Sequence, residues 1–365
     1  VLLDGAYGTA ISGDGQLGGV INLANGLPAP GTDIAVESGD LGVEFLDYIS
    51  TGKGKISMQV HEGAVSPDWL LAVELREADL MRKGESTAYI QDVNLGISAN
   101  VENVSLEKKS TERTLALKIL SANVTDMSVF SSYLPPDSPL QVTNGSAALA
   151  ADIVLETDNA DGWLTLDSTD LELWVDNQRV RSDLAVDITL VDGVPADMEF
   201  DFSGSEASLT NVQVIGENET FDNEKWSANI QLVEARTVWK KPLELQARAD
   251  INILDTRPVV ALLNNQGSKP QWLLDMLTIR DINGEVVVNI ADNQIVIPTA
   301  HAISDTMEVG AKGRISEQER DGIIYARYKK LDAVIKIADG KRNIDLIRAR
   351  GKYDEYQATS ATDGE

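Results

Sequence analysis

The sequence has no cysteine and only two histidines, His61 and His301. Without cysteine the chain forms no disulfide, no thiolate metal site and no cysteine nucleophile, which is compatible with a reducing cytosol and with a periplasm. The two histidines exclude a site with several histidine ligands, and a histidine-based triad would have to use one of them. Thiol chemistry is excluded, and any catalysis or metal binding by histidine would depend on these two residues.

Basic residues are also scarce, with 31 Lys and Arg against 58 Asp and Glu and a formal net charge of −27. This charge repels phosphate backbones, so nucleic-acid binding is not expected. The sequence also lacks an apolar run of about 18 residues and a charged-then-apolar leader, so we expect no spanning helix within it. Because the chain begins at Val1 in the middle of a pattern, we expect it to be an excised segment whose anchor or leader was removed.

What the sequence does contain is strand periodicity. In residues 243–253, LELQARADINI, apolar and polar side chains alternate with almost no exception. Residues 180–190, VRSDLAVDITL, show the same alternation. A period of two is typical of antiparallel strands with one face buried and one face wet. We therefore predict a mainly β protein of about 18 to 20 strands.

Turn and helix signals punctuate these strands. We predict helices in three segments, 41–50, 126–134 and 256–277, the last broken by Gly267 and Pro270. We predict hairpin turns where Asn-Gly or Asp-Gly pairs or lone glycines separate apolar runs. These turn sites are 25–26, 144–145, 161–162, 192–193, 283–284 and 321–322, with Gly216 and Gly340.

The stretch 131–156, SSYLPPDSPLQVTNGSAALAADIVLE, combines these signals. We expect Pro135 and Pro136 to stop a short helix and Asn144-Gly145 to turn the chain. The following Ala147–Leu155 is apolar enough to predict a strand buried on both faces. A helix followed by strand, turn and strand recurs weakly along the chain, and we expect three segments of one continuous structure, 1–125, 126–255 and 256–365.

Motifs for chemistry are missing or incomplete. GDGQLG at 13–18 matches a dinucleotide-binding fingerprint in letters, but a strand pattern follows it where a helix is required. TGKGKIS at 51–57 lacks the spacing of a phosphate-binding loop. Carboxylate pairs such as Asp167 with Asp170 fall on polar strand phases or in turns, which favours a solvated face over a glycosidase or calcium site. We expect no enzyme activity, no cofactor and no metal.

The apolar strand phases are aliphatic, since aromatic residues make up only 5% of the chain. A sandwich core usually contains bulky aromatics between its sheets, whereas smooth aliphatic side chains suit a surface along which acyl chains slide. Transfer of a phospholipid with roughly 30 methylenes from a bilayer to water costs about 25 kcal/mol, which an apolar environment in the protein would have to offset. A long sheet curled into a gutter supplies that environment, and one small pocket does not.

Several segments carry a family resemblance. YLPPDSPLQVTNGSAAL, DTRPVVALL, WLLDMLTIRDINGEVVVNIADNQIVI, GAKGRI and DGIIYARYKKLDAVIKIADGKRNIDLIRARG follow one another between Ser128 and Lys352. This order resembles the AsmA-like proteins of Gram-negative envelopes, which include the TamB and YdbH relatives, although the shared motifs are degenerate patterns of apolar residues and glycines. The resemblance implies a periplasmic β-groove, tethered to the inner membrane, that carries phospholipids toward the outer membrane. It brings no catalytic residues.

Together these observations predict an elongated, twisted antiparallel sheet curled into a groove or half-barrel, with a few short helices. The predicted function is passive transport of phospholipid or another acyl lipid in the periplasm, with inner- and outer-membrane proteins as further partners. The alternative is a structural or adhesive cell-surface β-sandwich. The residues predicted to line the groove are Leu184, Val186, Ile188, Leu190, Leu243, Leu245, Ile251, Ile253, Val286, Val288 and Ile290.

Overall fold

The computed structural model confirms a mainly β protein, with 72% of residues in strands and 8% in helices. Twenty-one strands belong to one antiparallel sheet, which is not closed. The residues that the structure describes are 10–45, 48–85, 87–104, 113–133, 140–175, 178–216, 220–240, 242–265, 270–316, 320–338 and 341–357.

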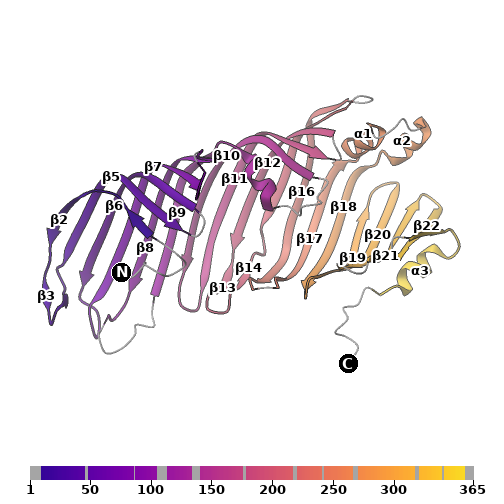
Figure 1. The fold of residues 1–365 in the computed structure, drawn as a ribbon. Helices are drawn as coiled ribbons and strands as arrows, with labels where there is room; N and C mark the ends of the chain where they lie inside the picture. The colour runs from indigo at the N-terminus through magenta and orange to yellow at the C-terminus, as the bar shows by residue number, and fades with distance from the viewer. Residues whose placement is uncertain are drawn as a thin grey trace. The chain divides into compact units, whose positions relative to one another are not determined.

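The secondary-structure elements follow the chain in the order shown in Figure 1. The strands are β1 (Ala10–Ser12), β2 (Gln16–Val20), β3 (Leu23–Ala24), β4 (Leu27–Pro28), β5 (Asp33–Phe45), β6 (Tyr48–His61), β7 (Asp68–Arg82), β8 (Ile90–Val101), β9 (Arg113–Val124), β10 (Leu140–Leu155), β11 (Ala160–Val175), β12 (Gln178–Leu190), β13 (Asp192–Val194), β14 (Glu199–Asp201), β15 (Glu206–Ile215), β16 (Thr220–Val238), β17 (Glu244–Asp255), β18 (Arg280–Ala291), β19 (Gln294–Ile303), β20 (Met307–Ile315), β21 (Arg320–Tyr328), β22 (Leu331–Ala338) and β23 (Lys341–Asp345). The helices are η1 (Met127–Tyr133), α1 (Arg257–Asn265), α2 (Gln271–Leu277) and α3 (Ala349–Glu355).

The chain divides into two compact units. Unit 1 comprises Val1–Leu171 with Gly193–Ala196, and unit 2 comprises Glu172–Asp192 with Asp197–Glu365. The three segments expected from the sequence, with joints after residues 125 and 255, stay a prediction.

Unit 1 contains an antiparallel meander. β1 and β2 both pair with β5, and from β5 to β10 each strand pairs with the next one along the chain. β3 and β4 form a separate hairpin around Asn25 and Gly26, both of which have positive φ. This is the predicted turn at 25–26, and positive φ at both central residues is what a two-residue hairpin loop requires.

Unit 2 contains a second meander. β12 pairs with β15, and pairing then runs from β15 through β16, β17, β18, β19, β20, β21 and β22 to β23. The predicted alternating segments 180–190 and 243–253 lie in β12 and β17, which confirms both strands. The predicted helical segments 126–134 and 256–277 are also confirmed, as η1 and as the pair α1 and α2.

The predicted helix at 41–50 is wrong. Residues up to Phe45 belong to β5, residues from Tyr48 belong to β6, and 46–47 lie outside the described residues. Leu41 and Val43 are both buried and pair with Gly52 and Ser50 of β6. A helix of about ten residues is marginal on its own, so pairing with a neighbouring strand decides the structure here.

Most of the predicted turns are also wrong, because the Asn-Gly and Asp-Gly pairs lie within strands. The pair at 144–145 is in β10, 161–162 is in β11, 283–284 is in β18 and 321–322 is in β21, while 192–193 begins β13. Gly216 directly follows β15, and Gly340 lies outside the described residues. At Gly145 and Gly162 φ is positive. At these two positions glycine lies within a strand and allows a local irregularity of the backbone, whereas a hairpin turn was predicted.

The stretch around β10 differs from its prediction in burial as well. Pro135 and Pro136 lie outside the described residues, and Ala147–Leu155 forms the second half of β10. Within it Ala147 and Ala151 are buried, whereas Ala148 is exposed. The predicted strand is confirmed, but the expected burial on both faces is wrong.

Irregularities with a common form interrupt the long strands. Glu77, Asp92, Asp170, Asn211 and Asp281 all have φ between 49° and 56° and all are exposed. The register shifts beside Glu77, Asp92 and Asn211 mark β-bulges. Each of the five left-handed residues is followed by an apolar one, and at Glu77, Asp92 and Asn211 the bulge restores that apolar side chain to its face and adds local twist.

A substitution in β18 tests the role of the left-handed residue. Asp281→Val is expected to lower the free energy of unfolding by about 1–2 kcal/mol, since a β-branched side chain is strained at φ 52°. Glu285→Val, at an exposed position of the same strand, is the matched control and is expected to change it by less than about 0.5 kcal/mol. Urea titration measures both, and equal midpoints for the two variants would refute the assignment.

Candidate functional site

One face of the unit 1 meander is aliphatic along its whole set of paired strands. Cross-strand register places one apolar side chain from each strand in a row from β5 to β10. The row consists of Val36, Ile56, Val73, Ile97, Leu117 and Ile153. A second row on the same face consists of Ile34, Met58, Leu71, Ala99, Leu115 and Leu155. We call this surface the apolar face of unit 1.

The opposite face of the same strands carries a row of mainly charged residues. This row is adjacent in sequence to the row that begins at Val36. It consists of Glu37, Lys55, Glu74, Gly96, Lys118 and Asp152. Its charges alternate in sign, and Lys118 lies 2.6 Å from Asp152. Opposite charges in directly paired positions favour this register, and a slip by one residue would turn the aliphatic set outward.

In these two rows the apolar face of unit 1 is only partly buried, whereas Leu75, Ala78 and Val124 further along the same face are fully buried. Of the row that begins at Val36, Val73 alone is buried, and the other members are half-buried. Leu115 in the neighbouring row is 37% exposed. In a sandwich a second sheet would cover such a face. Among the described residues the only other sheet is the two-stranded β3–β4 hairpin, so no second sheet covers it.

Unit 2 has a face of the same kind. A row in register from β12 to β22 consists of Val186, Ala207, Ile230, Ile251, Gly284, Ala302, Val309, Ala326 and Ala333. A shorter row beside it consists of Leu184, Leu209, Ala228, Ile253 and Ile282. Ile230 is 45% exposed. We call this surface the apolar face of unit 2.

Most residues predicted to line a groove lie together on the apolar face of unit 2. Leu184, Val186, Ile251 and Ile253 belong to the two rows above, and Leu245 is paired with Ile290 on the same face. Val286 and Val288 oppose Ala249 and Ala247 of β17. Ile188 and Leu190 continue the alternation of β12. Leu243 is separate, because it precedes β17 and is 43% exposed.

The face of unit 1 was missed in the sequence, although its signal is present. Leu71, Val73 and Leu75 alternate in β7, and Leu115, Leu117 and Ile119 alternate in β9. Both runs have the same period of two that identified β17. Bulges elsewhere in these strands interrupt the pattern and made it less visible.

Short helices cover the ends of these faces. In unit 2, Ala261 of α1 packs with Val180, Val214 and Trp226, against which Ile253 of the apolar face also packs. The start of α1 is fixed by Asp255, which is 2% exposed and whose carboxylate accepts hydrogen bonds from Arg257 at 2.6 and 2.9 Å. The hydrogen bond from Arg257 to Asp255 raises the pKa of Arg257.

The third helix lies on the other face of unit 2. Tyr353 and Ala349 of α3 pack on Ile323, Tyr325 and Val334. These three strand residues alternate with Ile324 and Ile335, which continue the apolar face. α3 therefore leaves the apolar face of unit 2 uncovered, and Figure 1 shows it beside β21 and β22.

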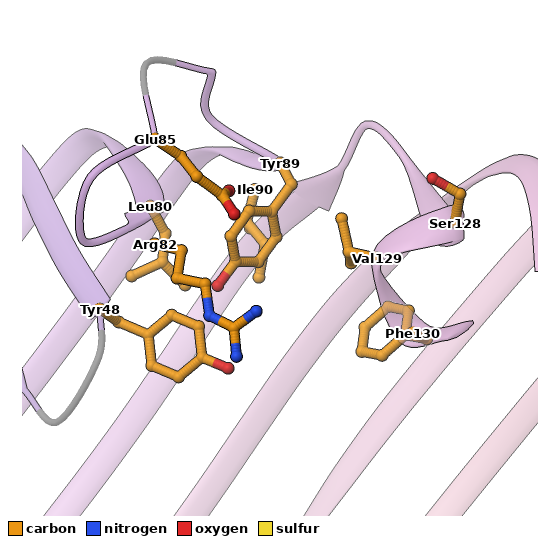
Figure 2. A pocket seen from close by; sticks show the side chains of 9 residues that line it. All are labelled: Tyr48, Leu80, Arg82, Glu85, Tyr89, Ile90, Ser128, Val129 and Phe130. Atoms are coloured by element: carbon orange, nitrogen blue, oxygen red, sulfur yellow. The ribbon is translucent and has the colours of Figure 1, made fainter. Parts of the chain in front are cut away.

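In unit 1, η1 lies at one end of the apolar face. The hydroxyl of Ser131 donates to the Val142 carbonyl at 2.7 Å and accepts from the Val142 N–H at 2.8 Å, which ties η1 to β10. Between η1 and the ends of β6, β7 and β8 is a pocket of about 400 Å³. Figure 2 shows its apolar lining, which includes Leu80, Ile90, Val129 and Phe130. Its polar lining includes Tyr48, Arg82, Glu85 and Tyr89.

Neither a metal centre nor a spanning helix emerges from the described part of the chain. No group of three or more His, Asp or Glu side chains is placed there to hold a metal ion. None of the helices with assigned positions is long and apolar enough to cross a bilayer. The distinctive feature of both units is an aliphatic face that no second large sheet covers among the described residues.

Comparison with known proteins gives no match that assigns the chain to a family. The family resemblance noted in the sequence therefore stays a prediction. No family model matches the chain, and neither the curated proteins nor the solved structures include one with significant similarity to it.

Proposed function

We propose that this protein is a passive lipid carrier, in which the sheet of each unit is curled into a groove that holds acyl chains. By the resemblance to the AsmA-like family, its cargo is phospholipid or another acyl lipid, moved between the inner and outer membranes across the periplasm of a Gram-negative bacterium. Membrane proteins at either side are its proposed partners. The chain acts by solvation alone, so the proposal needs no catalytic residue and no cofactor.

The observation that carries this proposal is the in-register aliphatic face without a covering sheet. An acyl chain of about 15 methylenes loses roughly 12 kcal/mol when it passes from bilayer to water. A row of aliphatic side chains over six strands in unit 1, and one over nine strands in unit 2 that is interrupted at Gly284, supply apolar contact to the acyl chain. The alternative of a sandwich is not favoured, because it requires a second large sheet.

The composition of the faces also supports movement of the cargo. Their side chains are almost all Val, Ile, Leu, Ala and Met, with Gly284 within the longest row. Such side chains offer contacts of similar strength at each position and no hydrogen bond that would hold a lipid in one place. The polar opposite face keeps the protein soluble while a lipid is bound.

Cysteine labelling tests the proposal directly, because the natural chain contains no cysteine. We expect Val186→Cys to react readily with a lipophilic maleimide and to be protected when the protein is loaded with phospholipid. Asp187→Cys is the matched control on the opposite face and is expected to react with hydrophilic maleimide whether lipid is present or not. A lipid extract of the purified native protein is expected to contain phospholipid. Absence of lipid from the extract, together with no loading by labelled lipid, would refute the proposal.

A further inference from the structure

The pocket beneath η1 joins the apolar face of unit 1 to a group of polar side chains. Leu80 pairs with Ser50 and with Ile90, and Ile90 pairs with Val124 of β9. Val124 in turn pairs with Ala147 of β10. The floor of the pocket is therefore a further row of the apolar face, at the end where β6 begins and β7 ends.

Arg82 lies one step beyond this floor. It is the last residue of β7 and pairs with Tyr48, two positions from Leu80 on the same side of the strand. Figure 2 shows Arg82, Tyr48 and Tyr89 pointing into the same part of the pocket. The rings of Tyr48 and Tyr89 meet edge to face, with centroids 6.2 Å apart.

The charge of Arg82 has no counter-ion among the residues described. Lys53, Arg76 and Lys118, on the polar face of unit 1, each lie within 3.0 Å of a carboxylate. Lys83, next to Arg82, lies 3.0 Å from Glu44. Arg82 forms no such pair within the described parts of the chain, and none with Glu85 on the pocket wall. A guanidinium without a counter-ion at the end of an apolar face favours an anion as its partner.

We infer that this pocket binds the anionic head of an acyl-chain amphiphile, a phosphate or a carboxylate, with Arg82 as counter-ion and the acyl chain laid over Leu80 and Ile90. The inference rests on the proposed function and adds to it a fixed orientation of the lipid in unit 1. A guanidinium presents two parallel N–H groups that match the oxygens of either anion. Tyrosines with an apolar ring and a polar end suit the boundary between head and chain.

The dimensions agree with this assignment. The pocket of about 400 Å³ lies within the range of ligand sites, roughly 300–1,000 Å³. From Arg82 to Leu71 the strand β7 covers about 36 Å at ~3.3 Å per residue. An acyl chain occupies about 15 Å, half of a ~30 Å bilayer core. A chain that begins at the pocket is therefore shorter than this part of the strand.

Fluorescence titration of the full chain tests the inference. An environment-sensitive dye on Thr125→Cys, next to η1, reports binding in unit 1. The probes are a long-chain fatty acid, the alkyl phosphate of equal length and the uncharged alcohol of equal length. We expect the native pocket to bind the two anions more tightly than the alcohol. Arg82→Gln is expected to weaken anion binding about tenfold or more and to leave alcohol binding unchanged.

Two further variants sharpen the test. Glu85→Gln is expected to tighten anion binding a few-fold, because it removes a negative charge from the pocket wall. Arg76→Gln, on the polar face, is expected to change nothing. Tighter binding of the phosphate or of the fatty acid by the native chain assigns the source of the anion.

The outcomes separate this inference from the proposed function. Equal affinity for anions and alcohol, unchanged in Arg82→Gln, would overturn the head-group site while leaving lipid binding intact. Failure of all three probes to bind anywhere on the native chain would overturn the proposed function and this inference with it.

Discussion

The double variant Ile97→Asp with Ile251→Asp is expected to lose phospholipid loading by roughly 100-fold. Each substitution places a carboxylate in the middle of one apolar face, since Ile97 pairs with Val73 and Leu117 and Ile251 pairs with Ile230 and Gly284. A carboxylate in contact with hydrocarbon costs about 3 kcal/mol, which corresponds to that factor in affinity. Lipid loading is measured by native mass spectrometry and by uptake of a labelled phospholipid.

The single variants and the controls distinguish the two faces. If each unit holds lipid, Ile97→Asp and Ile251→Asp alone are each expected to lower the amount of bound lipid by about half. Ser98→Asp and Asn252→Asp place the same charge one residue away on the polar faces and are expected to load like the native chain. Ile97 and Ile251 are half-buried without lipid, so a carboxylate there retains contact with water and the fold tolerates it. Native loading by the double variant would contradict the role of these faces.

Strand periodicity made much of unit 2 predictable. The alternation of β17 runs without a bulge against β18, so the set that begins at Leu245 keeps one side of the sheet to its end at Ile253. β12 is regular over the positions that pair with β15 on either side of Leu184 and Val186. In such strands the period of two in the sequence correctly assigns each side chain to one face of the sheet.

Bulges and glycines within strands limited how much of the remaining strand and turn structure could be predicted from the sequence. Asp92 and Asn211 each shift the register of their strand, and no single-sequence pattern separates a left-handed Asp or Asn in a bulge from one in a turn. The Asn283-Gly284 pair has the composition of a hairpin turn, yet it pairs with β17 on one side and β19 on the other. Pairing on both sides satisfies the backbone of Gly284, and this tertiary gain outweighs the local turn preference.

The pocket beneath η1 was beyond the reach of the sequence for a different reason. Arg82 is a single charged residue after an apolar run, and Tyr48 and Phe130 lie far from it in the chain. Only the pairing of Tyr48 with Arg82 and the position of η1 bring them to one place. Chemistry that depends on cross-strand register leaves no spacing signal in the sequence.

Outside the apolar faces, one charged cluster fastens α3 to unit 2. Glu308, 7% exposed, receives Arg350 of α3 at 2.6 Å, Arg327 of β21 at 2.6 Å and His301 of β19 at 3.1 Å. The guanidinium of Arg350 also lies 5.2 Å from the ring centroid of Tyr325. Burial alone would raise the pKa of Glu308, but the hydrogen bonds from His301 and Arg350 outweigh it, and the pKa is lowered from its ordinary 4.5.

Glu308→Gln is expected to lower the free energy of unfolding of unit 2 by about 2 kcal/mol at neutral pH. Breaking a fully buried ion pair costs ~3–5 kcal/mol, and the lower figure applies because both arginines are about half exposed. Urea titration of the full chain measures the change, and hydrogen exchange in β20 to β22 locates it. Glu355→Gln, which removes the exposed partner of Arg348 at 3.4 Å, is the control and is expected to change stability by less than about 0.5 kcal/mol.

The pH dependence of this difference separates charge from shape. Because the pKa of Glu308 is lower in the folded chain than in the unfolded chain, its stabilising contribution is complete above the unfolded value near 4.5 and disappears as the pH falls through the lower folded value. The difference in free energy of unfolding between the native protein and Glu308→Gln is therefore expected to stay constant from pH 7 to pH 6 and to decrease below pH 4.5. A difference in free energy of unfolding that is independent of pH would mean that packing of the Glu308 side chain, and not its charge, holds α3 on the sheet.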